Sequence, residues 1–212
     1  MSIYYFIFYF KDFDLFKKTE EVKMCKKLDE LSNLKLEHLY SMFEEEFSNA
    51  PIDIHSILEK LNIDYGAVDF GDIHGIYNGI NLPEQAGMVM GAVAAYSEKD
   101  DGKDYVEISV NKYDNYHRQR FTLAHELAHC MLHAESLRNG RIELRTALTS
   151  DDIKEIEANV LAGEILIPEK LLKTFYKTMP FPFLSFLAKK FDVSENVMKA
   201  RLQYLKMGYY TI

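Results

Sequence analysis

The chain contains the pattern H-E-x-x-H, which is formed by His125, Glu126 and His129. In a helix, residues four positions apart lie one turn from each other on the same face. The two imidazoles would therefore be able to bind one Zn²⁺ ion together. Glu126 would lie beside the open side of that ion, where its carboxylate can accept a proton from the attacking water. The pattern indicates a helix over residues 121–133 and a zinc-dependent hydrolase, most often a peptidase.

The residues around the pattern are typical of a buried helix. At about 100° per residue, Leu123, Leu127 and Met131 share one face, and the histidines form a separate polar strip. Such a strip needs a partner, because buried polar groups without one are destabilising, and a metal ion would be such a partner. The alternative is a core helix whose histidines are satisfied by ordinary hydrogen bonds, since H-E-x-x-H also occurs by chance.

A catalytic zinc takes a third protein ligand, and the next predicted helix, over residues 153–167, contains three glutamates. Ser150 is expected to cap this helix and Pro168 to end it. Glu157 and Glu164 fall within its apolar face, whereas Glu155 points away from that face. The apolar residues are Ile153, Ile156, Val160, Leu161 and Ile167.

A carboxylate on a buried face needs a cation or a hydrogen-bond donor. We therefore expect Glu157 to be the third metal ligand and Glu155 to be a solvated surface charge. The alternative for Glu157 is a salt bridge to an arginine. The candidate arginines are Arg118, Arg120 and Arg141.

Other polar side chains are candidates for supporting roles. Glu164 lies two turns beyond Glu157 and could orient a ligand or bind an arginine. His133, one turn past His129, could hydrogen-bond a substrate or a ligand, or could be an ordinary core or surface histidine. A peptidase also needs a group that stabilises the oxyanion. The candidates, between which their spacing does not decide, are Tyr113, Tyr116 and His117.

The hydrophobic pattern predicts an α+β fold, in which a small β-sheet packs with the helices that carry the candidate site. A helix is expected over residues 52–62, a strand over 64–68, and a hairpin of strands over 87–96 and 105–111. Helices are expected to dominate after residue 117.

Residues 183–206 are predicted to form a helix-turn-helix-like unit, with a turn at 192–194 and a second helix capped by Ser194. DNA binding is one interpretation. We favour the other, in which the two helices support the domain, because the second helix offers few exposed polar groups to read bases.

Composition limits the classes of function. The net charge of −8 argues against direct nucleic-acid binding. Two cysteines form no framework of disulfides, which favours a reducing, cytoplasmic compartment. The apolar run over residues 3–10 is too short to span a membrane and has no signal-peptide features. Residues 1–48 are interpreted as an N-terminal extension, expected to be helical, and residues 49–212 as the zinc metallopeptidase domain.

With both helices in view, the chain resembles the ImmA/IrrE-type metallopeptidases, peptidase family M78. The resemblance rests on the stretches RFTLAHELAH, LH, EAN and AGEILIP, over residues 120–129, 132–133, 157–159 and 162–168. It extends to a strand-like stretch, ISVN, and to a helix over residues 51–63, so that it covers the chain from about residue 50 onward. Ala128 stands where the family usually has glycine, which substitutes one small residue for another.

The resemblance implies a zincin-like fold with His125, His129 and Glu157 on the metal, a gluzincin-like set, and Glu126 as the catalytic base. Asn159, in the EAN stretch, is a further candidate for contact with a ligand or substrate. The implied function is cytoplasmic cleavage of a helix-turn-helix repressor of a phage, mobile element or stress response. The alternative is a non-proteolytic regulator that binds a repressor or toxin, but an intact Glu126 argues against it.

Overall fold

A computed structural model of the chain describes most of the segment from residue 30 onward. The described residues are 30–72, 76–77, 80–81, 89–97, 104–137, 142–146 and 153–211. The expected cap at Ser150, the arginine Arg141 and the apolar run over residues 3–10 lie outside them.

A mixed four-stranded sheet forms one layer of the fold, in the order β1-β5-β4-β6. The strands are β1 (Asp64–Val68), β4 (Val89–Ser97), β5 (Asp104–Asn111) and β6 (Ile142–Thr146). β1 runs parallel to β5, and β4 runs antiparallel to both β5 and β6. The predicted hairpin is therefore confirmed, whereas β6 was not predicted. A small separate ribbon pairs β2 (Ile76–Tyr77) with β3 (Ile80–Asn81).

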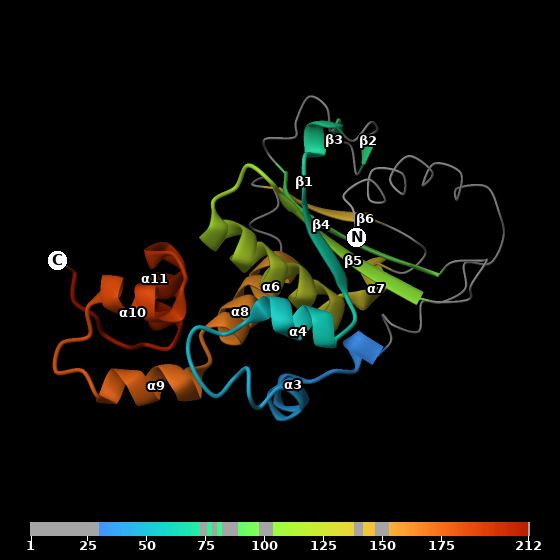
Figure 1. Cartoon of the computed structure of the whole chain (residues 1–212). Helices are drawn as coiled ribbons and strands as arrows, with labels where there is room; N and C mark the ends of the chain where they lie inside the picture. The colour runs from blue at the N-terminus through green and yellow to red at the C-terminus, as the bar shows by residue number, and fades with distance from the viewer. Residues whose placement is uncertain are drawn as a thin grey trace.

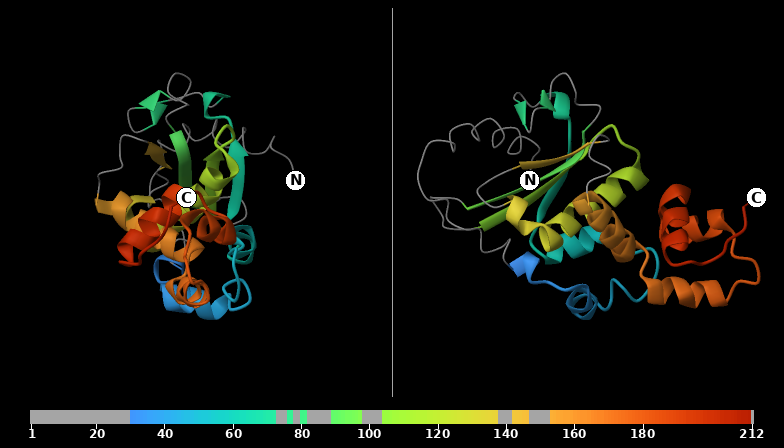
Figure 2. Two further views of the ribbon diagram at one scale, coloured as in Figure 1. Left: turned by 90° about the vertical axis from the view of Figure 1, so that its left-hand side faces the viewer. Right: turned by 180° about the vertical axis from the view of Figure 1, so that it is seen from behind.

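Helices cover one face of this sheet (Figures 1 and 2). They are α4 (Ile54–Lys60), α6 (Tyr116–Leu132) and α8 (Ile153–Leu166), with the short α7 (Ala134–Leu137) following α6. α6 begins where the side chain of Asn115 accepts a hydrogen bond from the backbone N–H of Arg118, which satisfies a free donor of the first turn. The expected α+β fold is confirmed.

The helix α6 is buried on nearly all sides because it lies between the sheet and α8. Its face predicted to be apolar packs into the core: Leu123, Leu127 and Met131 are 2%, 0% and 6% exposed. Cys130 is also buried, as expected for a small apolar side chain. The helix therefore carries its polar residues into the interior of the domain.

Part of the predicted N-terminal extension packs on this core. The helix α3 (Leu36–Met42) is formed there, and Leu31, Leu39 and Phe43 are buried in the same cluster as Ile54. The division of the chain at residue 48 stays a prediction, but the contacts tie residues 31–43 to the domain.

The C-terminal helices form a lobe beside α8 (Figure 1). They are α9 (Glu169–Lys177), α10 (Leu184–Phe191) and α11 (Glu195–Tyr204). The predicted turn and cap are confirmed: Asp192 adopts a left-handed conformation with φ 53°, and the Ser194 side chain accepts a hydrogen bond from the N–H of Val197. α11 packs against α8 through the buried side chain of Arg201, which fits a supporting role for these helices.

Candidate metal centre

The helix α6 places the three residues of the H-E-x-x-H pattern in the interior. His125, Glu126 and His129 are 0%, 1% and 3% exposed. The two histidines, one turn apart, direct their Nε2 atoms toward the same point, and these atoms lie 2.9 Å from each other. The helical geometry expected from the sequence is confirmed.

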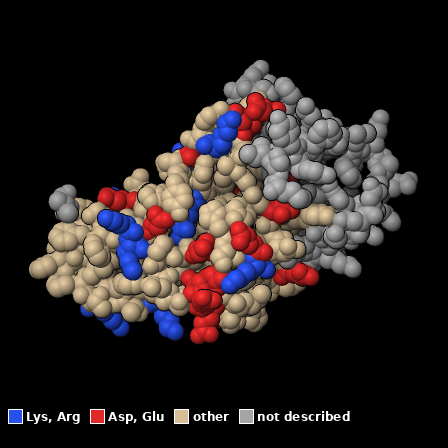
Figure 3. Space-filling model, in the orientation of Figure 1, with Lys and Arg blue, Asp and Glu red and all other residues tan. Residues whose placement is uncertain are grey.

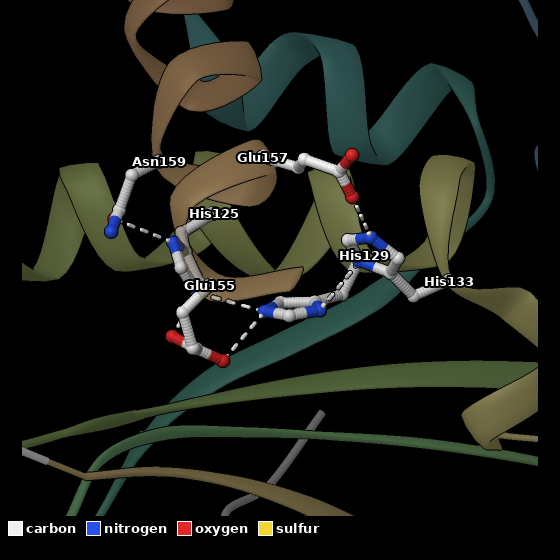
Figure 4. Close-up of polar contacts among 6 residues, drawn as sticks. All are labelled: His125, His129, His133, Glu155, Glu157 and Asn159. Carbon is white, nitrogen blue, oxygen red and sulfur yellow. Dashed lines mark hydrogen bonds and ion pairs between the residues drawn. The ribbon is translucent and has the colours of Figure 1, made fainter. Parts of the chain in front are cut away.

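A carboxylate from α8 completes this group, and it belongs to Glu155 (Figure 4). Its Oε2 atom lies 3.2 Å from Nε2 of His125, and its Oε1 atom lies 3.1 Å from Nε2 of His129. Ligand atoms of the three residues all lie within 4.8 Å of one another. Two imidazole nitrogens and one carboxylate are a donor set that suits zinc and leaves room for a further ligand, so the residues present fit a catalytic metal.

The expectation that Glu157 would be the third ligand is wrong, and so is the expectation that Glu155 would be a solvated surface charge. The side chain of Glu155 is 13% exposed, whereas that of Glu157 is 57% exposed and contacts His133 instead. The error came from the apolar face assigned to the helix, because Ile153 and Ile156 are 73% and 51% exposed.

The face of α8 that packs against α6 is made of small residues. Ala158 and Ala162 are fully buried, and Glu155 and Asn159 lie on the same side of the helix at spacings of three and four residues. Alanine lets two helices approach closely, so a short polar side chain on this face can reach across to the next helix. The alanines of EANVLAG were the sequence signal for this face.

Asn159 supports the first histidine. Its Oδ1 atom lies 3.0 Å from Nδ1 of His125, so it can accept a hydrogen bond from the Nδ1–H and leave the lone pair of Nε2 free for a metal. A polar partner of this kind commonly orients a metal-binding imidazole. The predicted candidate Asn159 therefore lies at the site.

The electrostatics of the group favour an ionised carboxylate. Burial alone would raise the pKa of the Glu155 carboxyl, but hydrogen bonds and charge from His125 and His129 outweigh burial and hold that pKa below its usual range. Glu155 therefore presents an anion toward the two imidazoles at neutral pH.

The side chain of Glu126 lies against the sheet, close to Gly91 of β4. A Cβ atom on Gly91 would lie 2.9 Å from Oε1 of Glu126 and 2.4 Å from Cγ2 of Thr122. Both distances are too short for an ordinary contact. Glycine at this position thus makes room for the carboxylate between α6 and β4.

The remaining candidates lie elsewhere. Tyr113 donates a hydrogen bond to Asp69 at 2.6 Å, and His117 contacts Asp192 at 3.1 Å. Tyr116 is 55% exposed at the first turn of α6. His117 precedes His125 by eight residues, which is about 12 Å along a helix. The structure therefore does not bring these three oxyanion candidates to the cluster of His125, His129 and Glu155.

Glu164 forms a salt bridge with Arg201 of α11. Binding an arginine was one of the two roles predicted for it. The same carboxylate accepts hydrogen bonds from the hydroxyl of Tyr40 at 2.7 Å and from the N–H of Glu169 at 3.1 Å. Its contacts join α8 to α3, α9 and α11 rather than to the metal ligands.

A comparison with protein families agrees with this geometry. A family profile described as the IrrE N-terminal-like domain, Peptidase M78, matches residues 90–203, which is more than half of the chain. The chain belongs to this family. The matched range contains all three residues of the cluster as well as Glu126, and membership supports a metallopeptidase-type function with a protein substrate. No curated protein matches the chain.

Within the described part of the M78 chain, no helix is long and apolar enough to cross a membrane.

Proposed function

We propose that the protein is a zinc-dependent endopeptidase in which His125, His129 and Glu155 hold the metal and Glu126 is the catalytic base. The observation that carries the proposal is the convergence of two Nε2 atoms and one carboxylate within 4.8 Å, with the two histidines on a helix that also carries the buried Glu126. Membership of the M78 peptidase family supports it. Three protein ligands suit a catalytic zinc, since a structural zinc usually has four, often including cysteine.

A bound zinc would lower the pKa of a water molecule toward about 7 and polarise the carbonyl of the peptide bond. The carboxylate of Glu126 accepts the proton of the attacking water and returns it to the leaving nitrogen. Asn159 holds the His125 ring in the orientation that directs Nε2 to the metal. Glu126 is 1% exposed, so bulk water has little access to its carboxylate.

The substrate is proposed to be a helix-turn-helix repressor in the cytoplasm, as the family resemblance implies. The charge of the chain supports a protein rather than a nucleic acid as partner, because 33 acidic residues exceed 25 basic ones. On the face seen in Figure 3, acidic side chains interrupt the basic ones instead of leaving a continuous positive surface. A phage, mobile-element or stress-response repressor fits this proposal.

A gene neighbour that encodes a helix-turn-helix protein is the first substrate to test. The purified protein should contain about one zinc per chain and should cleave that neighbour. Glu126→Gln should retain zinc and lose cleavage, since an amide cannot accept the proton. His125→Ala and Glu155→Ala should lose zinc as well as cleavage.

A second candidate function is a non-proteolytic regulator that binds a repressor or toxin. It has the same fold and metal ligands but makes no use of Glu126. If Glu126→Gln and the parent protein relieve repression equally and neither cleaves the partner, the regulator replaces the peptidase.

A further inference from the structure

The second metal-ligand histidine is connected to the surface by two further side chains. Nδ1 of His129 lies 3.2 Å from Nδ1 of His133, and Nε2 of His133 lies 3.0 Å from Oε2 of Glu157 (Figure 4). The exposed fraction rises along this series, from 3% at His129 to 7% at His133 and 57% at Glu157. His129 and His133 lie one turn apart on α6 and at its C-cap, and Glu157 comes from α8.

The hydrogen bonds of this series are consistent with only one arrangement of protons when His129 binds a metal through Nε2. A neutral imidazole carries one proton, so that of His129 must be on Nδ1. The Nδ1–H then donates to His133, whose Nδ1 must accept. His133 therefore carries its own proton on Nε2, where it donates to the carboxylate of Glu157.

We propose that His133 and Glu157 are positioning residues that hold His129 ready for the metal, an inference that rests on the proposed function. Glu157 selects the Nε2–H form of His133. That form selects the Nδ1–H form of His129, which leaves Nε2 free. The same contacts fix the angle of the His129 ring.

The two metal-ligand histidines are thus held in different ways. Asn159 of α8 contacts Nδ1 of His125 directly, whereas Nδ1 of His129 contacts His133, which in turn contacts Glu157 of α8. Because Glu157 is more than half exposed, water and salt screen its charge, so its effect must pass through the hydrogen bond to His133 rather than through a direct field at the metal.

The first test measures zinc affinity by competition with a chromophoric chelator. His133→Phe keeps a ring but removes both nitrogens, and Glu157→Ala removes the outer acceptor. Each is expected to weaken zinc binding by about 10- to 100-fold, as the loss of partners of metal ligands commonly does. Glu135→Ala is the matched control, because it removes an exposed carboxylate two residues from His133 and should leave affinity unchanged.

The double variant that combines His133→Phe with Glu157→Ala distinguishes a positioning role from a general loss of packing. Once His133 is replaced, Glu157 has no route to the metal ligand, so the double variant should bind zinc no more weakly than His133→Phe alone. His133→Asn should recover part of the affinity, because its side-chain oxygen can accept the Nδ1–H of His129. Additive losses in the double variant would overturn the proposal.

The second test reads the protons directly in metal-free protein. Side-chain ¹⁵N shifts at about pH 8, above the ordinary histidine pKa of about 6.5, distinguish the two neutral forms of His133. The Nε2–H form should predominate in the parent and lose its excess in Glu157→Ala, a surface substitution that leaves the core intact. If the parent binds zinc but neither affinity nor proton position changes in the variants, this inference fails and the proposed function stands. A parent that binds no zinc overturns both.

Discussion

Glu164→Ala is expected to destabilise the protein strongly, because it leaves a buried guanidinium without its carboxylate. Arg201 is 4% exposed, and its other hydrogen bond is from Nε to the carbonyl of Ile167 at 3.1 Å. Burial already lowers the pKa of Arg201, which shows that the charged form is held at a disadvantage there. The alanine variant would also leave the Tyr40 hydroxyl without its 2.7 Å acceptor.

Removing one partner of a buried ion pair commonly lowers the free energy of unfolding by about 3–5 kcal/mol. For a domain of this size, 1 kcal/mol corresponds to a shift of about 2–4 °C in Tm, so we expect Tm to fall by about 6–20 °C. Thermal unfolding followed by circular dichroism measures this shift. Tyr40→Phe, which removes one hydrogen bond to the same carboxylate, should cost about 1 kcal/mol.

Glu169→Ala is the matched control. Its side chain is 44% exposed and paired with Lys173, while its backbone N–H would still donate to Glu164. An exposed pair contributes at most about 1 kcal/mol. If Glu164→Ala lowers Tm no more than this control does, the carboxylate is not what stabilises Arg201, and the reasoning from burial is refuted.

Three further perturbations test other parts of the structure. Gly91→Ala should lower peptidase activity more than zinc content, because its Cβ would displace the Glu126 carboxylate or push Thr122 away. Burial, with the nearby carboxylate of Asp64, raises the pKa of Glu107 to about 7, so the parent should lose stability as pH rises from about 4.5 to 7. Glu107→Gln should therefore be more stable than the parent at pH 8 by about 1–3 kcal/mol, and by little at pH 4. Deleting residues 1–48 should lower Tm, since the deletion removes buried side chains of the core.

Each of these has a contrary result. Full activity in Gly91→Ala would mean that Glu126 does not need its place beside β4. An equal stability difference for Glu107→Gln at pH 4 and pH 8, measured by urea unfolding, would remove titration as the cause. An unchanged Tm after the deletion would mean that residues 31–43 form a separate extension and do not stabilise the core.

The sequence predicted the parts of the site that depend on local spacing. The positions of His125 and His129 follow from the helical repeat alone, and the hairpin of β4 and β5 follows from alternation. The third ligand depends on which face of α8 meets α6. We assigned the buried face from the isoleucines, but in the structure the face of α8 that packs against α6 carries alanines. Small side chains let the two helices approach closely, and this matters more at the contact than the apolar area that isoleucines would bury.

The oxyanion candidates were proposed because they lie in the sequence shortly before the histidines of α6. The rise of a helix separates them from the metal ligands, so nearness in sequence was a poor guide. Similarly, the pairing of His133 with Glu157 joins residues 24 positions apart on two helices. Neither helix shows a pattern that predicts it, because one hydrogen bond leaves no periodic signal.

The proposed metal ligands come from two helices, and binding of a metal to them would couple the stability of the fold to the metal concentration. His125 and His129 on α6 meet Glu155 only when α8 is packed beside them, so an unfolded chain has no comparable site. A ligand that binds only the native state stabilises it by RT ln(1 + [L]/Kd), about 2.7 kcal/mol at 100 times Kd. Chelation should therefore lower Tm, and added zinc should raise it in the parent but not in Glu155→Ala. The amount of folded protein in a cell would then follow the supply of the metal as well as the sequence of the chain.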